Sequence, residues 1–188
     1  MADVTLPMPI GIKKMATNYL EIKLRPYRTS DVDDFLIYGG DDRVTRFTRW
    51  NTFTSKEEAL FYINTFCIPH PYCRSLCIND RSIGFMIIMP RDGDDKCRAE
   101  VGYALAAEYW GQGITTRALK MATSDGFREF PDLTRMQASV EIENKASQRV
   151  LEKVGFRKEA VLRKYTINKG QIRDMVMYSL LSSDLISC

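Results

Sequence analysis

The stretch that decides the fold is residues 99–119, AEVGYALAAEYWGQGITTRAL. Its first seven residues predict a strand, and the apolar spacing after Ile114 predicts a helix that Pro131 ends. Between the two elements, Gly111 and Gly113 stand one residue apart. Glycine in such a place either completes a turn or lets the backbone approach a bulky group closely. The residues that follow the glycines help to distinguish these roles.

Two common phosphate-binding motifs do not fit these glycines. A P-loop requires Gly-Lys-Ser/Thr, but Ile114 and Thr115 follow Gly113. A dinucleotide fingerprint requires a third glycine where Thr116 stands. An ordinary strand-to-helix turn remains, and so does a helix N-terminus whose free amides bind a diphosphate. In the second case, the two threonines add hydroxyl donors and Arg117 adds a positive charge.

The remaining hydropathy pattern predicts an α/β domain with a mixed sheet of about seven strands and about four helices. The expected strands cover residues 19–25, 74–80, 82–90, 97–106, 133–142, 157–168 and 172–181. The expected helices cover residues 28–38, 54–66, 114–129 and 144–156. Thr29 or Ser30 is expected to cap the first helix, and Thr54 or Ser55 the second.

The composition is that of an ordinary globular domain. The chain has 188 residues, of which 45% are hydrophobic and 27% charged, and its formal net charge is +3. This charge is too small to indicate nucleic acid or an anionic membrane as a partner. No apolar run approaches the roughly 20 residues of a membrane helix. We expect residues 1–18 to form a short leader and residues 19–188 a single domain, located in the cytoplasm or shared with the nucleus.

The cysteines and the single histidine argue against metal and triad chemistry. Five cysteines without CxxC spacing favour a reducing compartment over a disulfide framework. His70 stands between two prolines, which indicates a loop residue. A zinc site needs three or four ligands at short spacings, and a Ser-His-Asp triad needs a nucleophile elbow to serve the histidine. We therefore expect no metal site.

A second motif follows about thirty residues later, in residues 144–156, NKASQRVLEKVGF. Asn144 opens a helix after a strand, and Ser147 lies one turn further on the same face. Alone, this is what a plain helix cap looks like. In this order after residues 99–119, it resembles the GNAT superfamily of acyl-CoA-dependent N-acyltransferases, and most of all the RimJ/RimL type. The resemblance covers nearly the whole chain, and its other parts are LRPYRTSDVDDF, VTRFTRWNTFTSKEEALFYI and GQIRDMVMYSLL.

The resemblance implies a mostly antiparallel GNAT sheet that splays between the strands at 97–105 and 133–142. Acetyl-CoA, as the acyl donor, would lie in this wedge, with its diphosphate on the amides after the strand. Trp110 takes the first position of the family's diphosphate motif and Thr115 the last, where the family has other residues. The resemblance implies that backbone groups of Tyr103, Ala104 and Leu105 pair with the pantetheine arm. The implied cofactor-binding residues are Tyr103, Ala104, Leu105, Trp110, Gly111, Gln112, Gly113, Ile114, Thr115, Thr116, Asn144 and Ser147.

The resemblance also implies direct acetyl transfer to a primary amine. Glu100 is the first choice for the base, and Glu141 on the facing strand is the alternative. Many members carry a tyrosine acid where Leu151 stands, so Ser147, beside Asn144 in the catalytic set, is its expected replacement. Cys97 is expected to be a buried spectator thiol. The acceptor pocket is expected to use Trp50, Phe47, Tyr165 and Asp174.

The acceptor itself stays open at this point. A protein N-terminus is the first expectation, while an internal lysine and a small polyamine are alternatives. Because Leu151 cannot donate a proton, a non-catalytic acyl-CoA-binding module that senses a metabolite or docks a partner is the rival hypothesis. The chain is expected to be a monomer or a homodimer.

Overall fold

The computed structural model describes residues 21–185 of the chain. The expected leader at residues 1–18 and the start of the first expected strand, at Tyr19, lie outside the described residues. Every other element expected from the sequence falls inside this range.

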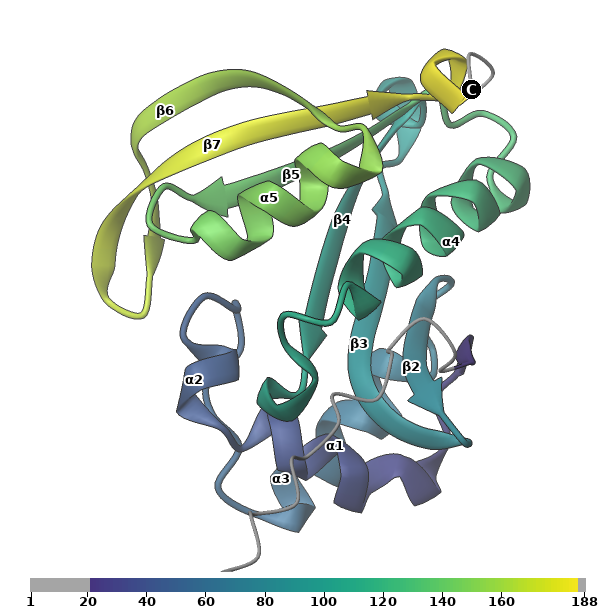
Figure 1. Ribbon diagram of the computed structural model, residues 1–188, viewed down its shortest axis with the longest axis vertical. Helices are drawn as coiled ribbons and strands as arrows, with labels where there is room; N and C mark the ends of the chain where they lie inside the picture. The colour runs from purple at the N-terminus through teal and green to yellow at the C-terminus, as the bar shows by residue number, and fades with distance from the viewer. Residues whose placement is uncertain (1–20, 186–188) are drawn as a thin grey trace, which may run out of the picture.

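Seven strands form one sheet in the order β1-β2-β3-β4-β5-β7-β6 (Figure 1). All neighbouring pairs are antiparallel except β4 and β5, which run parallel. The prediction of seven mostly antiparallel strands is therefore confirmed. The strands are β1 (Ile22–Pro26), β2 (Cys73–Ile78), β3 (Arg81–Pro90), β4 (Arg98–Leu105), β5 (Arg135–Glu141), β6 (Arg157–Asn168) and β7 (Gln171–Leu181).

Within residues 21–185, five α-helices accompany the sheet, one more than expected. The additional helix is α2, a four-residue turn whose first amides are capped by the side chain of Asp41, which accepts a hydrogen bond from the Arg43 amide. Four residues are too few to show a helical hydrophobic period, which explains why the sequence pattern missed it. The helices are α1 (Val32–Gly39), α2 (Asp42–Thr45), α3 (Lys56–Tyr62), α4 (Ile114–Glu129) and α5 (Lys145–Val154).

One of the two expected helix caps is confirmed. Ser55 Oγ accepts a hydrogen bond from the Glu58 amide at 3.2 Å and so caps α3. The expectation of Thr29 or Ser30 as the first cap is wrong, because both lie within a short 3-10 turn that precedes α1. Asp31 is the N-cap residue of α1 but makes no side-chain capping bond to that helix, and its carboxylate instead accepts a hydrogen bond from the Arg28 amide at 2.8 Å across the 3-10 turn.

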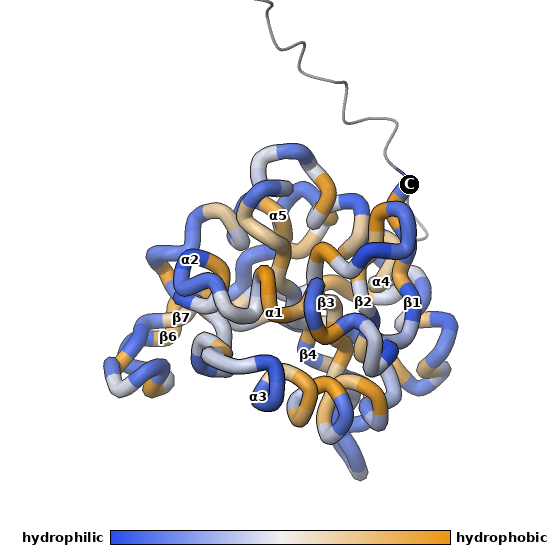
Figure 2. The backbone as a smooth tube through the Cα atoms, turned by 90° about the horizontal axis from the view of Figure 1, so that it is seen from below, coloured by the Kyte–Doolittle hydropathy of each residue, from blue (hydrophilic) through white to orange (hydrophobic). Residues whose placement is uncertain are grey.

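The helices divide between the two faces of the sheet (Figure 1). On the face that we call the front, α4 and α5 cover a core that includes Ile88, Val101 and Leu119. On the back, α1 and α3 cover a second core around Phe35, Phe85 and other buried aromatic and aliphatic side chains. In the view of Figure 2, hydrophobic segments gather near α1 and β3, while many outer turns are hydrophilic. The two cores fix which residues of β4 face forward and which face backward.

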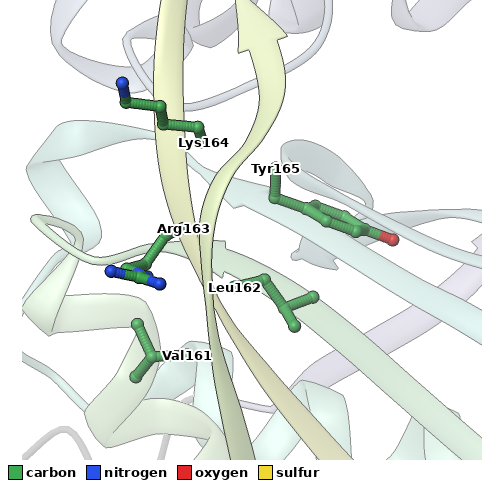
Figure 3. Close-up of a pocket in the computed structure, with 5 residues that line it drawn as sticks. All are labelled: Val161, Leu162, Arg163, Lys164 and Tyr165. Atoms are coloured by element: carbon green, nitrogen blue, oxygen red, sulfur yellow. The ribbon is translucent and has the colours of Figure 1, made fainter.

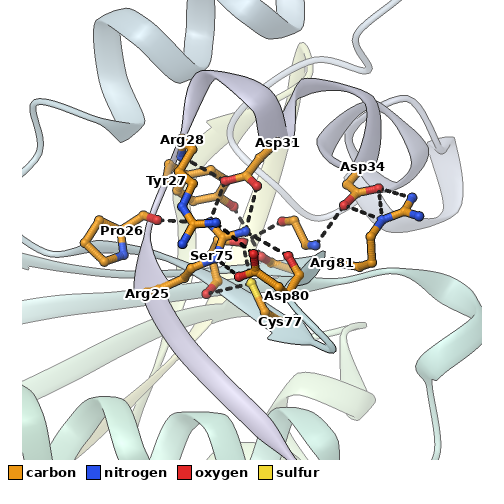
Figure 4. A network of polar contacts seen from close by, with 12 residues as sticks. Arg25, Pro26, Tyr27, Arg28, Asp31, Asp34, Ser75, Cys77, Asp80 and Arg81 are labelled. Carbon is orange, nitrogen blue, oxygen red and sulfur yellow. Dashed lines mark hydrogen bonds and ion pairs between the residues drawn. The ribbon is translucent and has the colours of Figure 1, made fainter.

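A polar network ties β1 to the start of α1 and to the β2–β3 turn (Figure 4). The Arg25 guanidinium donates to both carboxylate oxygens of Asp31, at 2.7 and 2.8 Å, and also to Asp80 at 2.9 Å. Only 6% of the Asp31 side chain is exposed. The hydrogen bond with Asp31 is the largest contribution to the raised pKa of Arg25. A buried carboxylate paired in this way is costly to neutralise, because the partner charge remains in place.

We predict that Asp31→Asn lowers the free energy of unfolding by about 2–3 kcal/mol, because Arg25 loses its bidentate partner. The matched control is Asp33→Asn, whose carboxylate pairs with Lys56 but is 71% exposed. This control should change the free energy of unfolding by less than about 0.5 kcal/mol. Urea unfolding of both variants checks the prediction, and equal losses would contradict it.

Candidate active site

The sheet opens between β4 and β5. Only three residue pairs join these strands, from Arg98 opposite Arg135 to Glu100 opposite Gln137. Beyond Glu100, β4 continues for five residues along β3 without a partner in β5. Figure 1 shows the two strands diverging there, as predicted. The gap leaves backbone groups on the inner edge of β4 without a strand to pair with.

Alternation along β4 decides which residues present their backbone groups to this opening. The Ala106 amide donates to the Ile83 carbonyl of the neighbouring chain segment at 2.9 Å. In an antiparallel ladder every second residue shares this orientation, so Ala104 also turns its N–H and C=O toward β3. Tyr103 and Leu105 face the opening. Ala104 therefore lacks the free backbone groups that the sequence resemblance implied for it.

The end of β4 is fixed by Trp110. Its indole Nε1–H donates to the Leu105 carbonyl at 2.8 Å. This bond occupies the Leu105 carbonyl and leaves its amide, together with both backbone groups of Tyr103, at the open edge. Trp110 is thus placed at the site by a structural bond to β4, while half of its surface remains exposed, at 49%.

The two glycines form the turn into α4. Gly111 and Gly113 both have φ of +74°, in the left-handed region that glycine adopts without strain. A Cβ built on either residue would meet nothing within 4 Å, so the space above the turn is open. Gln112 stabilises the turn, since its Nε2 donates to the Glu108 carbonyl at 3.1 Å. Glycine is therefore favoured at these two positions by the positive φ, and not by close packing against other residues of the described chain.

The first turn of α4 presents amides rather than side chains to this space. Ile114 is buried in the front core, whereas Thr115 and Thr116 are half-buried. The first amides of a helix have no intrahelical acceptor. Among residues 21–185, no hydrogen bond is found from the backbone amides of residues 111–116. The positive end of a 16-residue helix therefore points at an open surface beside the sheet opening.

Asn144 and Ser147 lie at the start of α5, across the opening from β4. The Asn144 side-chain oxygen accepts a hydrogen bond from the Ser147 amide at 3.1 Å and caps the helix. The Asn144 backbone amide donates to the Glu141 carbonyl at 2.9 Å, but no hydrogen bond from its side-chain Nδ2 is found within the described part of the chain, so Nδ2 is available as a donor. Nearby, Gln148 donates to the Ile142 carbonyl at 2.9 Å and joins α5 to the end of β5.

A bond that the sequence did not reveal joins β4 to α5. The phenol oxygen of Tyr103 lies 2.7 Å from Ser147 Oγ and 3.2 Å from the Ser147 carbonyl oxygen. Desolvation raises the pKa of Tyr103, and the hydrogen bond to Ser147 partly opposes that shift. The two residues are 44 positions apart, so no local pattern could have paired them. The sequence resemblance assigned Tyr103 only a backbone role.

Leu151 occupies the core rather than the site. Its side chain is fully buried among the front core residues. It therefore offers neither a polar group nor a surface to a ligand. This agrees with the expectation that Leu151 cannot replace a proton donor.

Glu100 lies on the back of the sheet, opposite to Tyr103. It shares the orientation of Ala104, which packs in the back core. Its side chain is 35% exposed, and Oε1 accepts a hydrogen bond from Arg91 Nη2 at 2.8 Å. The same bond is the first cause of the raised pKa of Arg91, to which nearby Tyr165 also contributes. Glu100 is thus a partly exposed carboxylate at the last β4–β5 pair.

Glu141, the alternative base, is buried. Its side chain is 3% exposed, lies 3.3 Å from Arg173 as an ion pair, and accepts a 2.6 Å hydrogen bond from Asn168. These partners hold the carboxylate between β5, β6 and β7. Glu143, two residues on, is exposed. Of the two candidate bases, Glu100 is the more exposed and Glu141 is buried.

The expected acceptor residues fall into two groups. Trp50 packs edge-on against Phe85 of the back core, with ring centroids 5.0 Å apart, and half-buried Phe47 lies under the Arg46 guanidinium. These are mainly packing contacts. Tyr165 is 55% exposed on β6. Asp174, on β7, accepts a 2.7 Å hydrogen bond from the Lys164 amide.

A bulge in β6 produces the hollow in which Tyr165 lies. Pairing with β7 jumps from Leu162 opposite Met175 to Thr166 opposite Arg173, so residues 163–165 bulge from the ladder. The hollow has a volume of about 620 Å³ and is lined by residues 161–165. Figure 3 shows Leu162 and Tyr165 pointing to one side of β6, and Arg163 and Lys164 to the other.

The β6–β7 hairpin is bonded to α2 and to the segment that follows it. Arg49 Nη1 donates to Thr166 Oγ1 at 3.1 Å. Lys169 Nζ donates to the Thr45 carbonyl at 2.7 Å. These two bonds span more than 110 residues of sequence and bring the bulged part of β6 over the helical segment.

The cysteines and the acidic groups offer no further site within the described range. Cys97 is exposed, which corrects the expectation that it is buried: it lies at the start of β4, before the strand enters the core. No cluster of three metal-ligating side chains occurs in residues 21–185. None of the helices in this range is long and apolar enough to span a membrane.

We predict that Asn144→Ala lowers the free energy of unfolding by about 1 kcal/mol, because the Ser147 amide loses its acceptor. Asn144→Ser is the matched control, since serine also caps helices and should retain most of that stability. Thermal unfolding of the two variants beside the parent chain checks this. A control as unstable as the alanine variant would show that the cap is not the cause.

Comparison with known proteins agrees with this geometry. A family model described as an acetyltransferase (GNAT) domain matches residues 21–157. The uncharacterized N-acetyltransferase p20 of Bacillus licheniformis is 32% identical over 180 residues, which cover 90% of this chain and 98% of p20.

Two solved structures share the fold. RimJ of Mycobacterium smegmatis, in complex with CoA-disulfide, has a TM-score of 0.72 at 26% identity, covering 87% of this chain and 83% of RimJ. RimL, a ribosomal L7/L12 alpha-N-protein acetyltransferase in complex with coenzyme A, has a TM-score of 0.73 at 20% identity, covering 88% and 96%. With its splayed sheet and a family match over most of its length, the chain belongs to the GNAT acetyltransferase family.

Proposed function

We propose that this protein is an N-acetyltransferase that moves the acetyl group of acetyl-CoA directly to a primary amine, with a protein N-terminus as the acceptor. The observation that carries the proposal is the juxtaposition of three features: the open edge of β4, the unpaired amides at the start of α4, and the free side-chain amide of Asn144. Together they offer donors and acceptors for a long, amide-rich ligand that ends in phosphates.

The residues fit acetyl-CoA part by part. Amides of residues 111–116 would hold the diphosphate, because the two glycines leave the space above them open. The backbone groups of Tyr103 and the Leu105 amide would pair with the pantetheine arm, as an added strand pairs with an exposed sheet edge. Asn144 Nδ2 would donate to the arm from the other side. Acetyl-CoA supplies the acetyl group as a thioester when bound.

The proposed catalytic groups lie on opposite faces of the sheet. Glu100, on the back, would take a proton from the amine, directly or through one water, while Arg91 holds one of its oxygens. Ser147, on the front, would donate a hydrogen bond to the departing thiolate. The Leu105 amide would polarise the thioester carbonyl. Placement of both reactants at the opening supplies much of the remaining acceleration.

The charges behind the sheet favour a peptide N-terminus over a polyamine. Glu100 and Glu141 are each paired with an arginine, so they provide little uncompensated negative charge. Arg163 and Lys164 point to the side of β6 opposite Tyr165 and do not line this face. A polycation therefore meets little uncompensated negative charge behind the sheet, and the formal net charge of +3 repels it at longer range, whereas a single amine followed by acidic or neutral residues is not repelled.

The alternative is a module that binds acyl-CoA without turnover. It is favoured by one observation: the helix position where many members hold a tyrosine acid is the buried Leu151. It differs from the main proposal in one testable respect, because it predicts cofactor binding with no acetylated product from any amine.

We expect acetyl-CoA and CoA to raise the melting temperature and ATP to leave it unchanged. A ligand at one hundred times its dissociation constant stabilises the native state by about 2.7 kcal/mol, which thermal unfolding resolves easily. Gly113→Val should weaken both shifts, since a branched side chain is strained at φ of +74° and fills the phosphate space. No shift with either CoA compound would overturn the proposed cofactor.

We also expect acetylation of a decapeptide with a free N-terminus and acidic residues at positions 3–6 to exceed that of its arginine-substituted counterpart. At low salt, kcat/KM for the acidic peptide should be roughly tenfold higher than kcat/KM for the arginine-substituted peptide, and this difference should shrink as salt screens the charges. The same peptide with a blocked N-terminus is the control, and spermidine is the competitor. Faster turnover of spermidine would refute the assigned acceptor class, and absence of product from every amine would favour the binding module.

A further inference from the structure

The partly buried phenol of Tyr103 has no role in the proposed transfer so far. Its side chain extends from β4 to the first turn of α5 and lies 2.7 Å from Ser147 Oγ. It does so just beyond the last β4–β5 pair, where the strands have separated. The Tyr103 side chain therefore bridges β4 and α5 on the front side of the opening. It lies beside the proposed path of the pantetheine arm.

The phenol has one proton and two acceptors within reach. These are Ser147 Oγ at 2.7 Å and the Ser147 carbonyl at 3.2 Å. When the phenol O–H donates its hydrogen bond to Ser147 Oγ, the serine O–H is free to donate a hydrogen bond to a third group. The Ser147 amide is already committed to Asn144, which fixes the start of the helix and hence the position of the hydroxyl. The arrangement forms a chain of two hydroxyl donors.

We propose that Tyr103 is a positioning residue that directs the Ser147 hydroxyl proton toward the sulfur of CoA and strengthens that hydrogen bond. This inference rests on the proposed function. During transfer the amine nitrogen forms a bond to the acetyl carbon and gives its proton to Glu100. The carbon–sulfur bond breaks, and its electron pair remains on the sulfur, which accepts the hydrogen bond from Ser147. No proton leaves Tyr103, so the chain stabilises the thiolate without consuming a donor. The departing thiolate takes its proton later, from solvent.

The physical basis is cooperative polarisation. A hydroxyl that accepts a hydrogen bond becomes a better donor, and the gain is larger away from water. Desolvation raises the pKa of Tyr103, which keeps the phenol protonated and therefore able to donate. Leu151 leaves the family's usual acid position apolar, so Ser147 and Tyr103 are the hydroxyl pair found at this side of the opening in the described chain.

The first test measures binding rather than turnover. A hydrogen bond to the thiolate lowers the pKa of the bound CoA thiol below its ordinary value of about 8.5. CoA should therefore gain affinity relative to S-methyl-CoA, which has no titrating proton, as pH rises from 6.5 to 9.5. Calorimetry should show this gain in the parent chain, a gain at least threefold smaller in Tyr103→Phe, and none in Ser147→Ala.

Tyr178→Phe is the matched control. The Tyr178 phenol is buried and also bonds to α5, through Glu152 at 2.9 Å, but it comes from β7. This variant should keep the full pH-dependent gain. The double variant Tyr103→Phe with Ser147→Ala should behave as Ser147→Ala alone, because the phenol acts through the serine. An unchanged gain in Tyr103→Phe would overturn the proposal.

Kinetics provide an independent readout. With acetyl-CoA, Tyr103→Phe should lower kcat about tenfold while KM for acetyl-CoA stays within twofold. With S-acetylthiophenol, whose thiol leaves readily without help, the loss should disappear. An equal loss with both donors would show that the phenol only holds the fold and would overturn the inference. Failure of the parent chain to bind either S-methyl-CoA or CoA would instead contradict the proposed function itself.

Discussion

The architecture depends on a ladder of only three residue pairs between β4 and β5. This is the only parallel pairing in the described sheet, and it joins the β1–β4 half to the β5–β7 half. If the ladder were longer, it would close the edge of β4 that the site uses. If it were absent, the two halves would be held by helices alone. The short ladder therefore keeps the sheet continuous at one end and open at the other.

Other bonds compensate for the missing pairs beyond Glu100. Tyr103 reaches α5, Trp110 returns to the end of β4, and the β6–β7 hairpin bonds to the segment around α2. Each of these contacts is made by a side chain rather than by a backbone ladder. Apart from the Leu105 carbonyl, which Trp110 occupies, this leaves the backbone polar groups of the open edge free, which is the condition for recognising an extended, amide-rich ligand.

Much of the fold could be predicted from the sequence, because most of its helices and strands are long enough to show the hydrophobic periodicity typical of each. The β4–α4 stretch is the clearest case: a strand, a glycine turn and a helix were expected and are found. The α2 turn was missed because it is too short for a period, and Thr29 or Ser30 was a wrong cap because a 3-10 turn precedes α1.

The site was less accessible to sequence reasoning. Its glycines and Asn144 belong to local motifs, which explains why they could be named. The Tyr103–Ser147 bond, the burial of Glu141 and the orientation of Ala104 all depend on register and on contacts between distant segments. No local pattern carries that information. The exposure of Cys97 likewise depends on where β4 enters the core.

The placement of Glu100 and Ser147 on opposite faces of one opening has a consequence for the order of events. A donor that enters from the front and an acceptor that enters from the back do not compete for the same space. Each can arrive while the other is bound, and each product can leave by the side from which its precursor came. Under the proposed function, both reactants would be bound before chemistry, and initial-rate plots against either one would intersect instead of running parallel.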